Sequence, residues 1–174
     1  MKFAILAPGH IAQSMAKAVA SIEKIERYAV ASREYARAEA FAKEWGFERA
    51  YGSYEEMLRD PQVELVYVAS PHSHHYRHAK MCLEHGKHVL VEKAFTVNAA
   101  QAGELIRISR QRGLLLAEAM WTRYMPSRRM IDDLIEGGAI GEVRSLTANL
   151  GFPMLHKERL REPALAGGAL LDVG

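Results

Sequence analysis

The sequence predicts an α/β fold with a doubly wound parallel sheet, on two observations. Between residues 2 and 119, short segments that are apolar on both faces alternate with segments of helical hydrophobic spacing. Strands that are apolar on both faces belong to parallel sheets whose two faces are covered by helices. Short connections between these segments favour the doubly wound arrangement known as the Rossmann fold.

The elements follow in order, and local signals mark several of their ends. Gly46 and Gly113 are typical helix terminators. Ser53 and Glu56 have capping-box spacing, and Asn98 is a good N-cap. The expected strands are residues 2–6, 27–32, a short one near 49–53, 64–70, 87–93 and 114–119. The expected helices are residues 11–24, 34–46, 53–58, 72–84 and 98–113.

The pattern changes after residue 120. Residues 125–141 read as a helix ended by glycines, and residues 142–152 as a strand with partial alternation. We therefore divide the chain into a dinucleotide-binding domain, residues 1–120, and an incomplete start of a second α/β domain, residues 121–174. A lone strand is unstable in water, so we expect residues 142–152 to be disordered, packed on the first domain or paired with another copy. We expect the chain to be part of a longer protein.

Composition excludes several classes of function. Basic and acidic residues nearly balance, 23 against 21, so neither nucleic acid nor a membrane surface is the expected partner. The apolar run near the N-terminus is too short for a signal peptide, and no run approaches the ~20 apolar residues of a membrane span. Cys82 is the only cysteine, which fits a reducing cytoplasm.

The turn after the first strand resembles a phosphate-binding turn in which only one of the usual glycines is present. A dinucleotide fingerprint places small residues at three positions, which Ala7, Gly9 and Ala12 occupy here. Gly9 stands where a pyrophosphate approaches the backbone, and the helix that follows offers free N–H groups. We expect Ala7, Gly9, His10 and Ile11 to contact the cofactor. This requires Ala7 to keep a backbone conformation open to non-glycine residues; the alternative is an ordinary turn.

The end of the second strand indicates which dinucleotide fits. An acidic residue there would bind the ribose hydroxyls of NAD, but this sequence has Ser32 and Arg33, with Arg37 one helical turn later. An arginine at this place suits the 2′-phosphate of NADP. We therefore predict NADP and leave NAD open; the alternative is a solvated arginine.

Three segments together resemble one family. They are "ASPHSHHYRHA" (69–79), "GKHVLVEKAF" (86–95) and "LAEAMWTRYMP" (116–126). The chain resembles the glucose–fructose oxidoreductase/inositol dehydrogenase family, Gfo/Idh/MocA, and within it the dihydrodiol dehydrogenases and NADP-dependent xylose dehydrogenases. The resemblance implies hydride transfer between a nicotinamide and a hydroxyl-bearing carbon of a sugar, polyol or trans-diol. It also implies a second α/β domain for substrate binding and assembly into a homo-oligomer.

The resemblance assigns roles to individual residues. It places Ser70, Pro71, His72 and His75 against the cofactor, although the family often has asparagine at the position of His72. It also places Glu92 there, beside the catalytic position of Lys93.

The same resemblance covers the Lys93 loop and the chain end. Ala94 stands where the family has proline, so we expect a trans peptide bond or a rearranged loop. Asp172 matches a catalytic aspartate that orients the substrate or Lys93. The general acid or base of the family falls two residues beyond Gly174.

Chemistry supports Lys93 as a catalytic residue. It ends a parallel strand at the carboxyl edge, where open α/β sheets bind ligands, and its ammonium can hydrogen-bond the reacting oxygen. Lys87, at the opposite end, is expected to be a surface residue. Trp121 and Arg123 either flank the nicotinamide or substrate, or pack at the domain junction.

The histidines of residues 72–78 do not predict a metal site. His74 and His78 are four residues apart and can share a helix face, but no cysteine or carboxylate nearby completes a ligand set. We interpret them as solvated histidines beside one cofactor-site histidine.

Three hypotheses follow from the sequence: a dehydrogenase of this family, a non-catalytic NADP-binding module or sensor, and a different Rossmann enzyme with another nucleotide. We favour the first, and expect this chain to bind NADP(H) but to turn over poorly.

Overall fold

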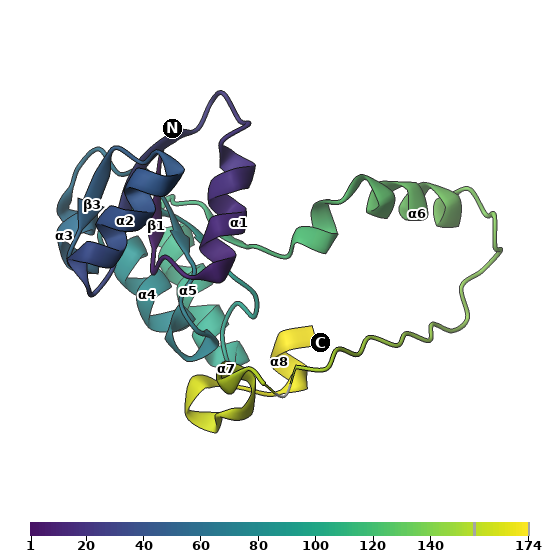
Figure 1. The fold of residues 1–174 in the computed structure, drawn as a ribbon. Coiled ribbons are helices and arrows are strands. Elements are labelled where there is room, and N and C mark those ends of the chain that lie inside the picture. Colours follow the sequence, from purple (N-terminus) through teal and green to yellow (C-terminus); the bar gives the residue numbers. More distant parts are fainter. Residues whose placement is uncertain (155, 174) are drawn as a thin grey trace.

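Six parallel strands form the centre of the molecule in a computed structural model that describes residues 1–154 and 156–173 (Figure 1). The strand order is β3-β2-β1-β4-β5-β6, so the order reverses between β1 and β4. The predicted doubly wound α/β sheet is confirmed. The strands are β1 (Lys2–Leu6), β2 (Glu26–Ala31), β3 (Arg49–Tyr51), β4 (Leu65–Val68), β5 (His88–Val91) and β6 (Leu116–Glu118).

Helices cover both faces of the sheet. Helices α1 (His10–Val19) and α2 (Tyr35–Trp45) bury Ala12, Ala16 and Phe41 on one face. Helices α3 (Tyr54–Arg59), α4 (His72–Glu84) and α5 (Ala99–Arg112) bury Met57, Leu83 and other apolar side chains on the other. This double cover explains why the strands are apolar throughout.

The predicted helix ends are present in the structure. Gly46 and Gly113 adopt left-handed φ values of 70° and 64°, which glycine accepts without steric cost. Ser53 Oγ accepts from Glu56 N at 3.1 Å, and Asn98 Oδ1 accepts from Gln101 N at 3.0 Å.

Helix α1 is shorter than predicted. The prediction extended it to residue 24, but it ends at Val19. Ile22 matches the helical pattern, yet it lies beyond the helix and is about half exposed. Its N–H donates to the Val19 carbonyl at 3.1 Å, which forms a turn. The last apolar side chain of the pattern therefore does not face the sheet.

The predicted strand over residues 142–152 is wrong. After η1 (Trp121–Tyr124) and α6 (Pro126–Glu136), the chain runs through exposed residues in which no strand forms between 142 and 152. Figure 1 shows this part standing away from the sheet. A strand needs a hydrogen-bonded neighbour, and none of the described residues supplies one here.

The last described segment returns to the sheet. It holds α7 (Glu158–Arg161), η2 (Pro163–Leu165) and α8 (Ala169–Val173), of which α7 and α8 are labelled in Figure 1. The η2 turn contacts α4. The Ala166 carbonyl lies 3.3 Å from His72 Nδ1. This return brings residues 79 to 94 positions apart together at the carboxyl edge of the sheet. None of the described helices has the length and apolarity that crossing a bilayer would need.

Candidate functional site

A cavity of about 1280 Å³ lies at the carboxyl ends of β1, β2 and β4. This is the point where the strand order reverses, which is where open α/β sheets bind ligands. Every site residue predicted from the sequence lines the cavity, except Trp121 and Arg123, which lie on the exposed turn η1. The predicted residues in the lining are Ala7, Gly9, His10, Ile11, Ser32, Arg33, Arg37, Ser70, Pro71, His72, His75, Glu92, Lys93 and Asp172.

The turn after β1 leaves room for a ligand. Gly9 is the N-cap of α1 and has an extended backbone conformation. Because glycine has no side chain, no side-chain oxygen at this position caps the first N–H groups of the helix. No atom lies within 4 Å of the place where a Cβ on Gly9 would stand. The first N–H groups of α1 and this open space together suit a phosphate.

The backbone conformation of Ala7 differs from the one expected from the sequence. Its φ is 67°, in the left-handed region that alanine rarely adopts. Its N–H continues the ladder to the Ala31 carbonyl at 3.0 Å, so the chain must turn sharply at this residue. Tertiary pairing of β1 with β2 therefore overrides the local preference.

The two arginines predicted for the ribose end differ in their contacts. Arg33 and Arg37 are both exposed at the cavity. Arg37 Nε donates to the Pro8 carbonyl at 3.2 Å and so ties α2 to the phosphate turn. Tyr54, which the sequence did not indicate, lines the same cavity. Burial raises the pKa of Tyr54, and the charges of Arg33 and Arg37 oppose this rise.

The histidines of α4 are more buried than predicted. His72, His75 and His78 are all buried, so the interpretation of His78 as a solvated residue is wrong. His78 Nδ1 lies 2.9 Å from Ser70 Oγ. Burial, reinforced by the neighbouring charges of His74 and Arg77, lowers the pKa of His78 to about 4.

Helical spacing accounts for these positions, because residues 72, 75 and 78 follow each other by one turn and face the sheet. Among the described residues, no cluster of three or more histidine, cysteine or acidic side chains is close enough to hold a metal ion.

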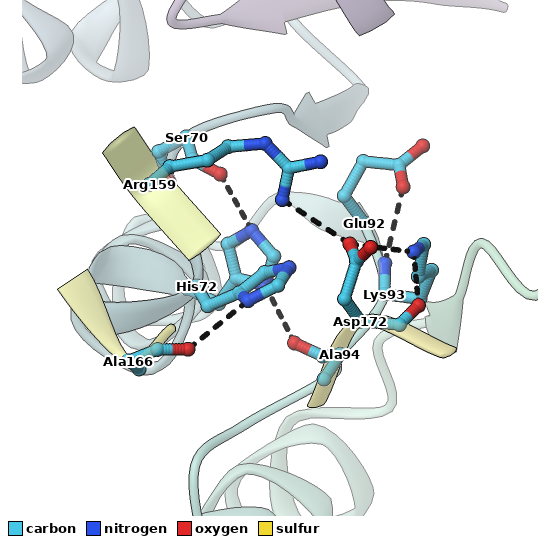
Figure 2. Close-up of polar contacts among 9 residues, drawn as sticks. Ser70, His72, Glu92, Lys93, Ala94, Arg159, Ala166 and Asp172 are labelled. Carbon is cyan, nitrogen blue, oxygen red and sulfur yellow. Dashed lines mark hydrogen bonds and ion pairs between the residues drawn. The ribbon is translucent and has the colours of Figure 1, made fainter. Parts of the chain in front are cut away.

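Lys93 and Asp172 form the polar centre of the site (Figure 2). Lys93 Nζ donates to the Asp172 backbone carbonyl at 2.5 Å and to its Oδ1 at 3.1 Å. Arg159 Nη1 lies 3.2 Å from the same carboxylate oxygen. Burial of Asp172 favours its neutral form, but hydrogen bonds and charge from Lys93 and Arg159 outweigh burial and lower the pKa of Asp172. Asp172 is therefore a carboxylate at neutral pH.

The loop that carries Lys93 differs from the expectation in one peptide bond. The Lys93–Ala94 bond is cis, so the expected trans bond is wrong. The Ala94 carbonyl lies 2.6 Å from His75 Nδ1. This contact joins two separate segments, so the local sequence around Ala94 does not predict it. Glu92 accepts a hydrogen bond from the hydroxyl of the buried Tyr67 and another, at 3.2 Å, from the N–H of Lys93.

Lys87 is not the expected surface residue. Its side chain is buried, and Nζ donates to the Asp60 carbonyl at 2.7 Å at the opposite edge of the sheet. Sequence reasoning also missed Arg159, because nothing near residue 159 indicates a partner at residue 172.

Comparison with known proteins places these features in context. The model of the Gfo/Idh/MocA family, described as "Oxidoreductase family, NAD-binding Rossmann fold", matches residues 1–120 of this chain. Trans-1,2-dihydrobenzene-1,2-diol dehydrogenase of Mus musculus is 38% identical over 176 residues, which cover all of this chain and 53% of that protein. D-xylose 1-dehydrogenase (NADP(+)) of Hypocrea jecorina is 40% identical over 196 residues, covering all of this chain and 50% of that protein.

A solved structure shares the fold. KijD10, a 3-ketoreductase from Actinomadura kijaniata crystallised with NADP, superposes with a TM-score of 0.78 at 32% identity, over 83% of this chain and 46% of that one. The chain thus spans about half the length of the curated relatives it matches.

Proposed function

Because this chain belongs to the Gfo/Idh/MocA oxidoreductase family, with its NAD-binding Rossmann fold, we propose that it is part of an NADP-dependent dehydrogenase. The proposed reaction transfers a hydride between the nicotinamide and a hydroxyl-bearing carbon of a sugar, polyol or trans-diol. The observation that carries the proposal is the ammonium of Lys93, held by Asp172 at the wall of the cofactor cavity.

The residues present fit a dinucleotide. The open space at Gly9 and the N-terminus of α1 take the pyrophosphate, and Arg33 lies at the ribose end of the same cavity. Ser70, Pro71, His72 and His75 line the part that lies toward Lys93. When bound, the nicotinamide accepts or supplies the hydride.

Lys93 acts on the oxygen of the reacting carbon. An ammonium has three N–H donors, and Asp172 takes two of them, through its carbonyl and its Oδ1. No acceptor among the described residues takes the third donor, so it can hydrogen-bond the substrate oxygen. Negative charge grows on that oxygen when, in the direction of reduction, a hydride arrives at its carbon. Asp172 keeps the ammonium in place, and Arg159 keeps Asp172 in place.

Arg33 carries the preference for NADP in this proposal. A hydrogen bond between charged groups contributes about 1.5–3 kcal/mol, so Arg33→Ala should weaken NADPH binding roughly 10- to 100-fold. NADH lacks the 2′-phosphate, and its affinity should change less than about threefold. Arg37 is less suitable for this test, because it also supports the Pro8 turn.

Titration calorimetry of the full chain with NADPH and NADH measures this difference. Arg110→Ala, on the exposed face of α5, is the matched control and should leave both affinities unchanged. Turnover is then followed with NADP and D-xylose or a trans-dihydrodiol. Equal affinity of the wild-type chain for NADPH and NADH would contradict the NADP assignment, and an absence of binding would overturn the proposal as a whole.

The proposal extends to organisation and location. The division into a dinucleotide-binding domain, residues 1–120, and the start of a second domain, residues 121–174, remains part of it. We also propose a homo-oligomer, which the exposed Met130, Ile131 and Leu134 on α6 support, and a cytoplasmic location, which the buried free thiol of Cys82 supports. Light scattering after gel filtration tests the oligomer.

A further inference from the structure

Three successive residues of the loop that carries Lys93 are each held by a side chain. The N–H of Lys93 donates to Glu92 Oε2 at 3.2 Å, and the Ala94 carbonyl lies 2.6 Å from His75 Nδ1. The N–H of Phe95 donates to Glu118 Oε1 at 2.8 Å. Figure 2 shows the first of these contacts beside the Lys93–Asp172 pair. The backbone of this loop is thus fixed by side chains rather than by regular secondary structure.

These side chains come from three different elements. Glu92 directly follows β5, His75 lies in the first turns of α4, and Glu118 is the last residue of β6. The Val91 carbonyl also accepts the Ala119 N–H at 2.7 Å, so the ends of β5 and β6 are joined beside the loop. Glu92 is in turn anchored by the hydroxyl of Tyr67 from β4.

We infer that Glu118 is a positioning residue for Lys93, acting together with His75. Glu118 does not belong to the lining of the cofactor cavity, so its contact reaches the site only through the backbone of the loop. Its acceptor holds the far side of the loop, and His75 holds the middle. The reach of Lys93 Nζ to Asp172 depends on where these two contacts place the Lys93 backbone.

His75 holds the Lys93 loop when its Nδ1 carries a proton, as in one neutral tautomer and in the protonated ring. Its Nε2 lies 2.6 Å from the Ser70 carbonyl, while its Nδ1 faces the Ala94 carbonyl. A neutral ring has one N–H and donates to one of these carbonyls, and a protonated ring donates to both. His75 thereby links the end of β4 to the Lys93 loop.

The first test measures the position of Lys93 without any turnover. Competitive acetylation of the full chain, followed by mass spectrometry, compares Lys93 with the exposed Lys17 and the buried Lys87. Glu118→Met removes the acceptor at similar size, and should raise the labelling of Lys93 at least threefold relative to Lys17. Glu118→Gln keeps an acceptor oxygen and should stay near the wild-type value. Glu48→Met, at an exposed glutamate, is the surface control.

Lys87 separates positioning from a loss of stability. It lies at the opposite edge of the sheet, so a loosened Lys93 loop leaves its labelling unchanged. An equal rise at Lys87 and Lys93 in Glu118→Met, or no rise at Lys93, would overturn the inference. Hydrogen exchange at the Phe95 amide should increase in the same variant and not in Glu118→Gln.

The second test uses kinetics and rests on the proposed function. Misplacement of a catalytic group by about 1 Å costs up to about 100-fold in rate, so kcat of Glu118→Met should fall between 10- and 100-fold. The KM for NADP should change less than threefold, because Glu118 does not belong to the lining of the cofactor cavity. Glu118→Gln should restore kcat. If the wild-type chain binds no NADPH, the proposed function fails, whereas the labelling test decides the role of Glu118 independently of any turnover.

Discussion

Individual residues in this chain adopt states that their own chemistry disfavours. Ala7 takes a left-handed φ of 67° at the end of β1. His78 is buried beside Ser70, and its pKa is lowered to about 4. In both cases the sheet and its helices supply contacts that outweigh the local cost. Such residues are the ones where a single substitution has a measurable and directional effect.

Ala7→Gly should stabilise the fold. The left-handed conformation costs alanine about 1–2 kcal/mol, and the extra freedom of glycine in the unfolded chain offsets about 0.4–1 kcal/mol of this. We expect the free energy of unfolding in urea to rise by about 0.5–1 kcal/mol. Ala12→Gly, inside α1, is the matched control and should lower it by about 1 kcal/mol. A loss of stability in Ala7→Gly would show that the turn is not strained.

His78→Gln should reduce the loss of stability in acid. The folded pKa of His78, about 4, lies below the unfolded value of about 6.5, so the unfolded state binds more protons. The contribution of the neutral, buried His78 to the free energy of unfolding is therefore complete above pH 6.5 and is lost as the pH falls toward 4. Between pH 7 and pH 5 this amounts to about 2 kcal/mol.

The measurement is the free energy of unfolding at both pH values. Glutamine can keep the contact with Ser70 Oγ and does not titrate. The exposed His85, changed to glutamine, is the control and should leave the pH dependence unaltered. If the free energy of unfolding fell equally between pH 7 and pH 5 in His78→Gln and in the wild type, His78 would not be the source of this pH dependence.

At the scale of elements, caps and paired strands place the site residues. Ser53 and Asn98 start α3 and α5 through their side chains, while Gly46 and Gly113 end α2 and α5. The β5 and β6 ends deliver Glu92 and Glu118 to the Lys93 loop. The geometry of the site thus depends on element ends more than on their interiors.

Asn98→Ala should lower the free energy of unfolding by about 1 kcal/mol, because the N–H of Gln101 loses its acceptor. Asn98→Ser keeps an N-cap oxygen and should stay within a few tenths of the wild-type value. Chemical denaturation measures both. Equal stability of the alanine and serine variants would argue against this cap.

At the scale of the whole molecule, the sheet with its helices contrasts with residues 137–157. These residues are mostly exposed and contain no helix or strand among the described positions, whereas residues 158–173 return to the sheet edge. The Lys93–Asp172 pair and the contact of His72 with the Ala166 carbonyl hold this return. The site therefore combines the sheet with a segment far along the chain.

Trypsin should cleave after Arg144 first. The Arg144 side chain is 80% exposed and its segment has no regular structure, whereas cleavage after the buried Lys87 needs an opening of the sheet. We expect a rate ratio on the order of 100 or more, followed by mass spectrometry of the fragments. Arg144→Gln should remove the first fragment. Early cleavage after Lys87 would contradict the described arrangement.

The sequence by itself determined the α/β order, the helix caps and the candidate residues at the ends of the first two strands, because periodicity, glycines and cap residues act over a few positions. The resemblance to a family then gave Lys93 and Asp172, with the residues near 70–75 and Glu92, and left open whether Asp172 orients the substrate or Lys93. Only the tertiary structure decided the φ of Ala7, the burial of His78 and Lys87, the missing strand at 142–152, and the roles of Arg159 and Glu118. Each of these depends on contacts between distant segments, which have no local signal in the chain.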